Sequence, residues 1–255
     1  MIAYAPVALP EWNATSYDAI SAPQQEWGAG VVERLALRGD ETVIDAGAGT
    51  GRVTELLLER LPRGRVIAVD GSQAMCERAR ARLPTERVTV ICSDLVELAL
   101  PEPVDAIVSN ATFHWILDHD ALFARMRALL RAGGQFVAQF GGTGNISRAR
   151  AVAETLGPPF APYLQAMGPT WNYPTPQETR ARLERAGFLV DACWLEPAPV
   201  TPPKPREFLE TVLFRVHVAH LPDELVGPFI DAVMERLGDP PVLDYVRLNW
   251  DARAR

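Results

Sequence analysis

Three glycines at alternate positions follow an acid and a short apolar run, in the stretch VIDAGAGTG at 43–51. Residues 52–61 then carry apolar side chains at helical spacing. Glycine has no Cβ, so the main chain of such a turn can approach a ligand closely, and the start of the next helix offers unpaired N–H groups. Strand, glycine turn and helix together predict a backbone cradle for a ligand at the C-terminal end of the strand. The alternative is a tight turn that binds nothing.

The glycine spacing separates two classes of ligand. A dinucleotide fingerprint has its third glycine three residues after the second. Here Arg52 occupies that place, and the third glycine comes one residue earlier, at Gly51. A nicotinamide-dependent oxidoreductase therefore stays an alternative, disfavoured by this spacing.

Polar residues also follow the next three predicted strands. Asp70 ends the second strand, where a carboxylate can accept hydrogen bonds from both ribose hydroxyls; the alternative is a cap for the helix that begins near Ser72. Asp94 follows the third strand and could accept from an adenine amino group, or simply form a turn. Asn110 follows the fourth strand, at the edge where the glycine turn lies.

These features together resemble the class I S-adenosylmethionine (SAM)-dependent methyltransferase family across roughly residues 20–140. The tract NATFHW at 110–115 resembles small-molecule members such as trans-aconitate methyltransferases. Tyr17 followed by Gln24 and Gln25 is similar to members in which an N-terminal helix covers the cofactor. Beyond residue 141 only the final strands look like the family.

The resemblance implies SAM as cofactor and S-adenosylhomocysteine (SAH) as product. It implies that the glycine turn holds the methionine moiety with help from Asp45, that Asp70 takes the ribose, and that Asp94 with Leu95 takes the adenine. The cofactor residues implied in this way are Tyr17, Gln25, Asp45, Ala46, Gly47, Ala48, Gly49, Gly51, Asp70, Gly71, Met75, Ser93, Asp94, Leu95, Asn110 and Ala111.

Methyl transfer needs a general base only when the acceptor is neutral, such as a phenol or an alcohol; a carboxylate needs none. His114 is the candidate base, because its ordinary pKa lies near neutrality; the alternative is a packed histidine. The candidate substrate residues are Tyr17, His114, Trp115, Arg148, Trp171 and Tyr173. For the aromatic residues the alternative is local core, and for Arg148 a solvated surface position. His217 and His220 lie three residues apart without a third ligand, so no metal site is expected.

Alternating strands and helices must position these residues, which predicts a parallel sheet with right-handed crossovers. Strands are expected at 42–46, 65–70, 88–92, 104–109, 135–140, 188–195 and 242–250. Helices are expected at 51–61, 72–83, 118–131, 206–219 and 222–237, with others opened by capping residues at Ser21 and Thr175. The expected fold is α/β, a doubly wound, mostly parallel seven-stranded sheet of Rossmann-like methyltransferase type with a helical or irregular lid; the resemblance implies the reversed last strand.

The chain divides into three parts on this interpretation. Residues 1–140 hold an N-terminal cover helix and the SAM-binding core, although 1–20 read as irregular. Residues 141–180 form a lid or substrate insertion, with one helix near 147–156. Residues 181–255 complete the sheet with inserted helices, after a stretch at 197–205 whose five prolines exclude a helix.

Composition limits the partners. The net charge is −7 without a basic run, which argues against nucleic acid. No apolar run reaches membrane-spanning length, and the three cysteines lack close spacing, so we expect a reduced, cytoplasmic protein, a monomer or homodimer. The expected partner is a small molecule, a carboxylate or hydroxyl compound. A non-catalytic SAM-fold protein is a further alternative, and a nucleic-acid or protein methylase is disfavoured by the charge and by the lack of an Asn-Pro-Pro-aromatic motif.

Overall fold

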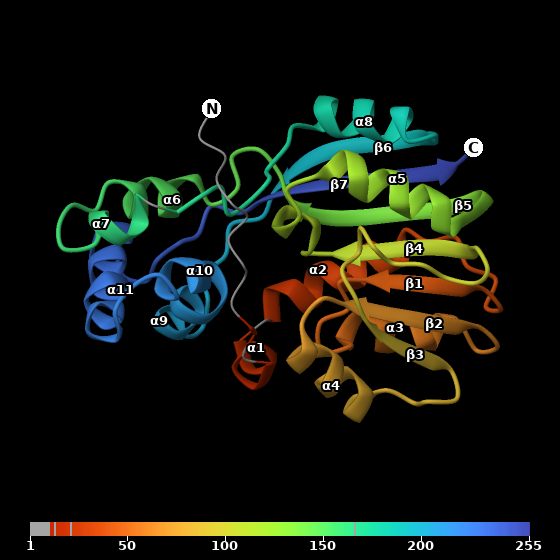
Figure 1. Cartoon of the computed structure of the whole chain (residues 1–255), viewed down its shortest axis with the longest axis horizontal. Helices are drawn as coiled ribbons and strands as arrows, with labels where there is room; N and C mark the ends of the chain where they lie inside the picture. Colours follow the sequence, from red (N-terminus) through yellow and green to blue (C-terminus); the bar gives the residue numbers. More distant parts are fainter. Residues whose placement is uncertain (1–10, 13, 21, 166) are drawn as a thin grey trace.

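The computed structural model describes residues 11, 12, 14–20, 22–165 and 167–255. A seven-stranded sheet with the order β3-β2-β1-β4-β5-β7-β6 runs through the molecule (Figure 1). This confirms the expected doubly wound, mostly parallel fold. The strands are β1 (Thr42–Ala46), β2 (Arg65–Asp70), β3 (Val88–Cys92), β4 (Val104–Asn110), β5 (Leu130–Gly141), β6 (Phe188–Pro197) and β7 (Val246–Ala254).

The strand directions bring separate parts of the chain to one edge of the sheet. β1 to β5 pair in parallel, while β7 runs antiparallel between β5 and β6. At that edge Asn110 of β4 pairs with Gln139 of β5, and Gly141 of β5 lies opposite Arg247 of β7. The start of β7 therefore lies beside the C-terminal ends of the parallel strands.

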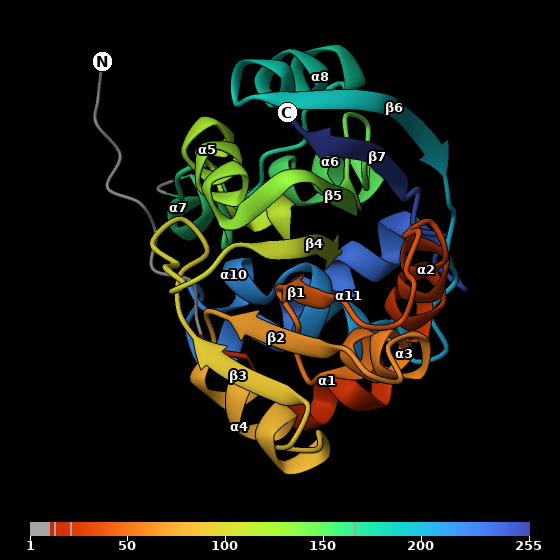
Figure 2. The same ribbon diagram turned by 90° about the vertical axis from the view of Figure 1, so that its right-hand side faces the viewer.

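Helices cover both faces of the sheet (Figure 2). One face packs against α2 (Ala22–Glu33), α3 (Arg52–Arg60) and α4 (Gln73–Arg82), and the other against α5 (His119–Leu129) and α8 (Pro176–Arg185). Side-chain caps fix three of these helix starts. Ser72 and Asp118 each accept a hydrogen bond from a backbone N–H in the first turn. Thr175 and Glu178 form the predicted capping box.

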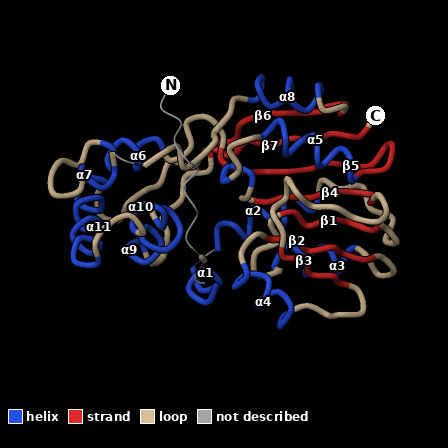
Figure 3. The backbone as a smooth tube through the Cα atoms, in the orientation of Figure 1, coloured by secondary structure: helices blue, strands red, loops and turns tan. Residues whose placement is uncertain are grey.

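A separate hydrophobic cluster lies beyond the C-terminal edge of the sheet (Figures 1 and 3). It contains large buried rings such as Phe160, Phe214 and Phe229. Its helices come from two segments of the chain. The segment after β5 contains α6 (Ser147–Glu154) and α7 (Ala161–Leu164), and the segment after β6 contains α9 (Pro205–Phe208), α10 (Arg215–Val218) and α11 (Asp223–Leu237). The two segments thus share one core.

The stretch expected to be irregular contains a helix, α1 (Ala14–Ile20). Asp18 holds it against the sheet domain: its carboxylate accepts hydrogen bonds from Thr50 at 2.5 Å, from Arg52 at 3.0 Å and from Arg82 at 2.8 Å. These partners lie more than thirty residues away, so local sequence pattern does not reveal them. Residues 1–10 and the predicted cap at Ser21 lie outside the described residues.

Three expected boundaries were wrong. The helix expected at 206–219 is interrupted by a π-helical turn at Leu209–Leu213 and bends at Phe214. The last strand begins at 246 rather than 242, because Leu243 bridges to Val200 instead. The helix expected to run to 131 ends at Leu129, and β5 begins directly after it. Among the described residues, no helix combines the length and the apolar character needed to cross a membrane.

Candidate functional site

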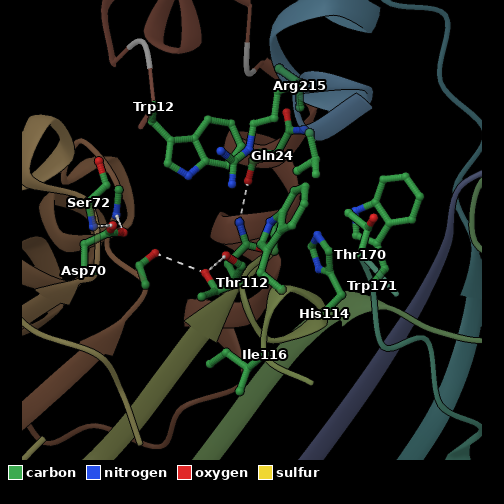
Figure 4. Close-up of a pocket in the computed structure, with 18 of the residues that line it drawn as sticks. Trp12, Gln24, Asp70, Ser72, Thr112, His114, Ile116, Thr170, Trp171 and Arg215 are labelled. Atoms are coloured by element: carbon green, nitrogen blue, oxygen red, sulfur yellow. Dashed lines mark hydrogen bonds between the residues drawn. The ribbon is translucent and has the colours of Figure 1, made fainter. Parts of the chain in front are cut away.

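A cavity of about 570 Å³ lies between the C-terminal edge of the sheet and the helical cluster (Figure 4). Asp70 and Ser72 lie at one end of it, and His114 and Trp171 at the other. The cofactor residues implied by the sequence that line it are Tyr17, Gly47, Gly49, Asp70, Gly71, Met75, Ser93, Asp94, Leu95, Asn110 and Ala111. Of the candidate substrate residues, it is lined by Tyr17, His114, Trp115, Trp171 and Tyr173.

Asp70 connects the glycine turn to the start of α4. Its carboxylate accepts from the backbone N–H of Gly49 at 2.8 Å and from that of Ser72 at 2.9 Å. Burial raises the pKa of Asp70, and these two hydrogen bonds partly oppose the rise. The carboxylate is thereby fixed in orientation at the cavity wall, with lone pairs left for hydroxyl donors.

Gly47 allows the turns after β1 and β4 to approach closely. Its φ is +81°, and a Cβ at this position would lie 2.1 Å from Oγ1 of Thr112. That hydroxyl donates to the carbonyl of Gly47 at 3.2 Å. The adjacent Ala111 also has a positive φ, of 57°, which is uncommon for a residue with a Cβ. Only glycine fits at position 47 while the two turns meet in this way.

Several expected site residues do not line the cavity. Asp45 is buried beneath the turn and accepts from the hydroxyl of Thr54 at 2.6 Å. Burial raises the pKa of Asp45 to about 7, although the hydrogen bond from Thr54 lowers it. Gln25 accepts from Arg52 at 2.9 Å, and the side chain of Arg148 is exposed. The expected residues outside the lining are Gln25, Asp45, Ala46, Ala48, Gly51 and Arg148.

His114 is enclosed by aromatic rings. Its ring centroid lies 5.0 Å from that of Trp115, 5.8 Å from that of Tyr173 and 6.3 Å from that of Phe140. Burial, with a smaller effect of the nearby Arg247 charge, lowers the pKa of His114 well below its usual value. The imidazole is therefore neutral at pH 7, and its low pKa makes it a weak base.

Arg247 is a lining residue that sequence reasoning missed. It lies near the N-terminal end of β7, is 2% exposed and stacks over Trp27, with the guanidinium carbon 4.4 Å from the ring centroid. Nε donates to Oε1 of Gln139 at 3.2 Å, while Nη2 has no hydrogen-bond partner among the described residues. Burial lowers the pKa of Arg247 to about 10, so the side chain still carries its charge at neutral pH.

Arg215 of α10 also lines the cavity and was missed. Its guanidinium carbon lies 3.8 Å from the ring centroid of Trp12 and 4.7 Å from that of Trp115. Trp12 in turn packs against Tyr17, with 5.3 Å between ring centroids. Aromatic residues near the N-terminus and after β4 thus contact a cation from a helix at least 100 residues later in the chain (Figure 4).

No spacing in the sequence identifies these additional residues, because each belongs to a distant element. Glu11 is a third example: its carboxylate accepts from the hydroxyl of Ser72 and from the backbone N–H of Ala74 at 3.0 Å. Within the described ranges, His, Cys, Asp and Glu form no group of three that could hold a metal ion.

Comparison with known proteins identifies the central part of the chain. A family model described as a methyltransferase domain matches residues 43–134. This range begins at β1 and ends within β5, so it contains the glycine turn, Asp70 and Asn110.

Curated relatives match over a similar part. Trans-aconitate 2-methyltransferase of an Azoarcus species is 34% identical over 150 residues, which is 59% of this chain and 58% of that protein. Malonyl-[acyl-carrier protein] O-methyltransferase of Priestia megaterium is 32% identical over 133 residues, 51% of this chain and 48% of that protein. The chain therefore spans about half the length of the curated relatives that it matches.

A solved structure supports the fold across more of the chain. Phosphoethanolamine N-methyltransferase 2 of Haemonchus contortus, in complex with SAH, aligns with a TM-score of 0.62 and 19% identity, covering 95% of this chain and 56% of that one. The matched family model and the curated relatives identify residues 43–134 as a methyltransferase domain of the class I SAM-dependent family, and the solved structure supports the fold.

Proposed function

We propose that the chain binds SAM in the cavity beside Asp70 and transfers its methyl group to a small molecule, releasing SAH. The observation that carries this proposal is the carboxylate of Asp70 held by the N–H of Gly49 in the wall of a cavity whose volume is typical of cofactor and small-molecule sites. The family of the domain supports the same assignment.

The polar atoms of the cavity fit this cofactor. Oε1 of Gln24 and Oδ1 of Asn110 are buried acceptors without a hydrogen-bond partner among the described residues. Both residues line the cavity, and they are joined by a hydrogen bond of 2.7 Å from Nδ2 of Asn110 to the backbone carbonyl of Gln24. Two unsatisfied acceptors suit the ammonium group of a methionine moiety. We therefore assign that group to Gln24 and Asn110, while Asp45 supports the turn from below.

SAM supplies the activated methyl group. The protein's contribution is alignment and the exclusion of water, and alignment alone can lower a barrier by about 7 kcal/mol in favourable cases. Trp12, Trp115 and Trp171 line the cavity, with 5.8 Å between the ring centroids of Trp12 and Trp115, and we assign to them the shielding of the bound acceptor from solvent. A dry, apolar wall also suits a reaction that disperses the positive charge on sulfur.

We propose a carboxylate as the acceptor group. A carboxylate is already ionised at neutral pH and needs no base, which agrees with the low pKa of His114. Relatives named for trans-aconitate and malonyl-[acyl-carrier protein] point the same way. A hydroxyl acceptor is the alternative, and His114 would then have to take its proton.

Incubation with methyl-labelled SAM and a panel of organic acids, phenols and isoprenoid alcohols tests the proposal. We expect label in the methyl ester of an acid. Transfer to a phenol or alcohol alone would overturn the carboxylate assignment. SAM binding without transfer to any class would instead indicate a non-catalytic SAM-fold protein.

A further inference from the structure

Arg247 carries a buried charge, and the described residues place no acid against it. Among the described residues it forms no ion pair, and its Nη2 atom has no hydrogen-bond partner. Burying a cation is costly unless it is paired and hydrogen-bonded. An arginine in this condition at a cavity wall is suited to bind an anion that the described residues do not provide.

The neighbours of Arg247 are neutral. Trp27 lies against its guanidinium, Gln139 accepts a hydrogen bond from Nε, and the phenol of Tyr245 is nearby, with 6.0 Å from the guanidinium carbon to the ring centroid. Glu196 pairs with Arg247 in the sheet, but its exposed side chain accepts instead from Asn249 at 3.5 Å. No acid of the neighbouring strand therefore neutralises the guanidinium.

The sheet order places this charge at the acceptor end of the cavity. Asp70 ends β2, and the strands between it and β7 are β1, β4 and β5. Four strand spacings of about 4.8 Å separate the two positions by roughly 19 Å. The two charged residues thus mark opposite ends of the cavity that both line.

We infer that Arg247 binds a second carboxylate of the acceptor, one that is not methylated. This inference rests on the proposed function. The reacting carboxylate must offer a lone pair to the methyl carbon, and a direct guanidinium pair would draw electron density away from it. Arg247 therefore holds a different carboxylate of the same molecule and fixes the reacting group in line. A planar guanidinium matches a carboxylate in two parallel hydrogen bonds.

The test compares C4–C8 dicarboxylic acids with their monoamides, measured by calorimetry on the SAH-loaded protein. The variants are Arg247→Met, which removes the charge and keeps an unbranched side chain, and Arg247→Lys, which keeps the charge. Arg253→Met is the matched control, since Arg253 lies on the same strand, exposed and paired with Asp191 at 2.8 Å. The thermal midpoint of each variant is measured alongside.

We expect SAH to bind all four proteins equally. The best diacid should bind Arg247→Met about 10- to 100-fold more weakly than wild type, the loss expected for one charge-assisted interaction. Arg247→Lys should recover part of the loss and Arg253→Met should show none. Monoamides should bind wild type and Arg247→Met with equal affinity. The effects on affinity of replacing Arg247 and of replacing the second carboxylate by an amide are then not additive, as expected for two groups in contact.

The inference is overturned by equal diacid affinity in wild type and Arg247→Met, by a tenfold loss of SAH affinity in Arg247→Met, or by binding of phosphate monoesters in place of diacids. The second would assign the guanidinium to the cofactor's own carboxylate. If Arg247→Met does not fold, equal affinity of wild type for diacids and monoamides overturns the inference by itself. Wild-type protein that binds SAH but no diacid also refutes it, whereas failure to bind SAH refutes the proposed function.

Discussion

The carboxylate of Asp70 accepts a hydrogen bond from the backbone N–H of Gly49, with 2.8 Å between Oδ2 and N. The second oxygen accepts from Ser72 at 2.9 Å. One side chain at the end of β2 thus fixes the turn after β1 and the start of α4, and these three segments line the same wall of the cavity. A residue proposed to bind the ribose also shapes the turn that holds the methionine moiety.

Replacement of Asp70 should therefore weaken cofactor binding strongly. We expect Asp70→Ala to lower SAH affinity by at least about 30-fold, because hydrogen bonds to a charged group contribute about 1.5–3 kcal/mol each. Asp70→Asn should lose less, since an amide oxygen can still accept from Gly49. Calorimetric titration with SAH measures both, and circular dichroism checks the fold. Unchanged affinity in a folded Asp70→Ala variant would refute the ribose assignment.

Two glycines of the turn should respond differently to alanine. At position 47 the new Cβ would meet Thr112 at 2.1 Å, whereas at position 49, where φ is +55°, it would meet no atom within 4 Å. Gly47→Ala should destabilise the protein by about 2–5 kcal/mol, from backbone strain and overpacking. Gly49→Ala should cost about 1–2 kcal/mol from the positive φ alone.

Urea unfolding measures the difference between the two glycine variants, and SAH titration adds an independent readout. Gly49 lines the cavity and a Cβ there would enter open space, so Gly49→Ala should remain folded and bind SAH more weakly. Equal stability of the two variants would contradict the close approach of Gly47 and Thr112.

Asp45 should make stability depend on pH. Burial raises the pKa of its carboxyl from 3.8 to about 7 in the folded protein. Between about pH 4 and pH 7 the folded state then binds more protons than the unfolded state, so the free energy of unfolding falls as pH rises through this window. Asp45→Asn removes the titration and should flatten that part of the profile. Urea titrations of both proteins at pH 5 and pH 8 measure the change, and an identical pH dependence in both would show that Asp45 does not titrate there.

His114→Asn should separate the two acceptor classes. With a carboxylate acceptor we expect a kcat within about tenfold of wild type, since removal of a general base typically costs about 10²–10⁴-fold. Because the pKa of His114 lies well below its usual value, the wild-type rate should also be flat between pH 6.5 and 8. A loss above 100-fold in kcat, with SAH affinity unchanged, would show that His114 acts as a base.

The part of the site that could be predicted consists of residues that are close in the sequence and also close in the structure. The apolar run before Asp45, the alternate glycines and Asp70 belong to one continuous strand-turn-helix-strand unit, and the carboxyl ends of parallel strands meet at one edge. The local sequence pattern is therefore enough to predict that Gly49 and Asp70 lie close together.

The acceptor side could not be predicted in the same way. Arg247 lies in a strand whose expected start was four residues too early, and a shift of register by one residue moves a side chain to the other face. Arg215 follows a π-helical turn at Leu209–Leu213 that contains neither glycine nor proline. Both arginines line the cavity because the helical cluster and β7 pack against distant parts of the chain. Arg247, for example, is hydrogen-bonded to Gln139, more than 100 positions away.

Calorimetric titration of the unmodified protein with SAH and, separately, with NADH shows which of the two cofactor classes the cavity beside Asp70 binds. We expect saturable binding of SAH at one site per chain, weakened at least about 30-fold by Asp70→Ala, and no binding of NADH. Tight binding of NADH together with no binding of SAH would contradict this expectation.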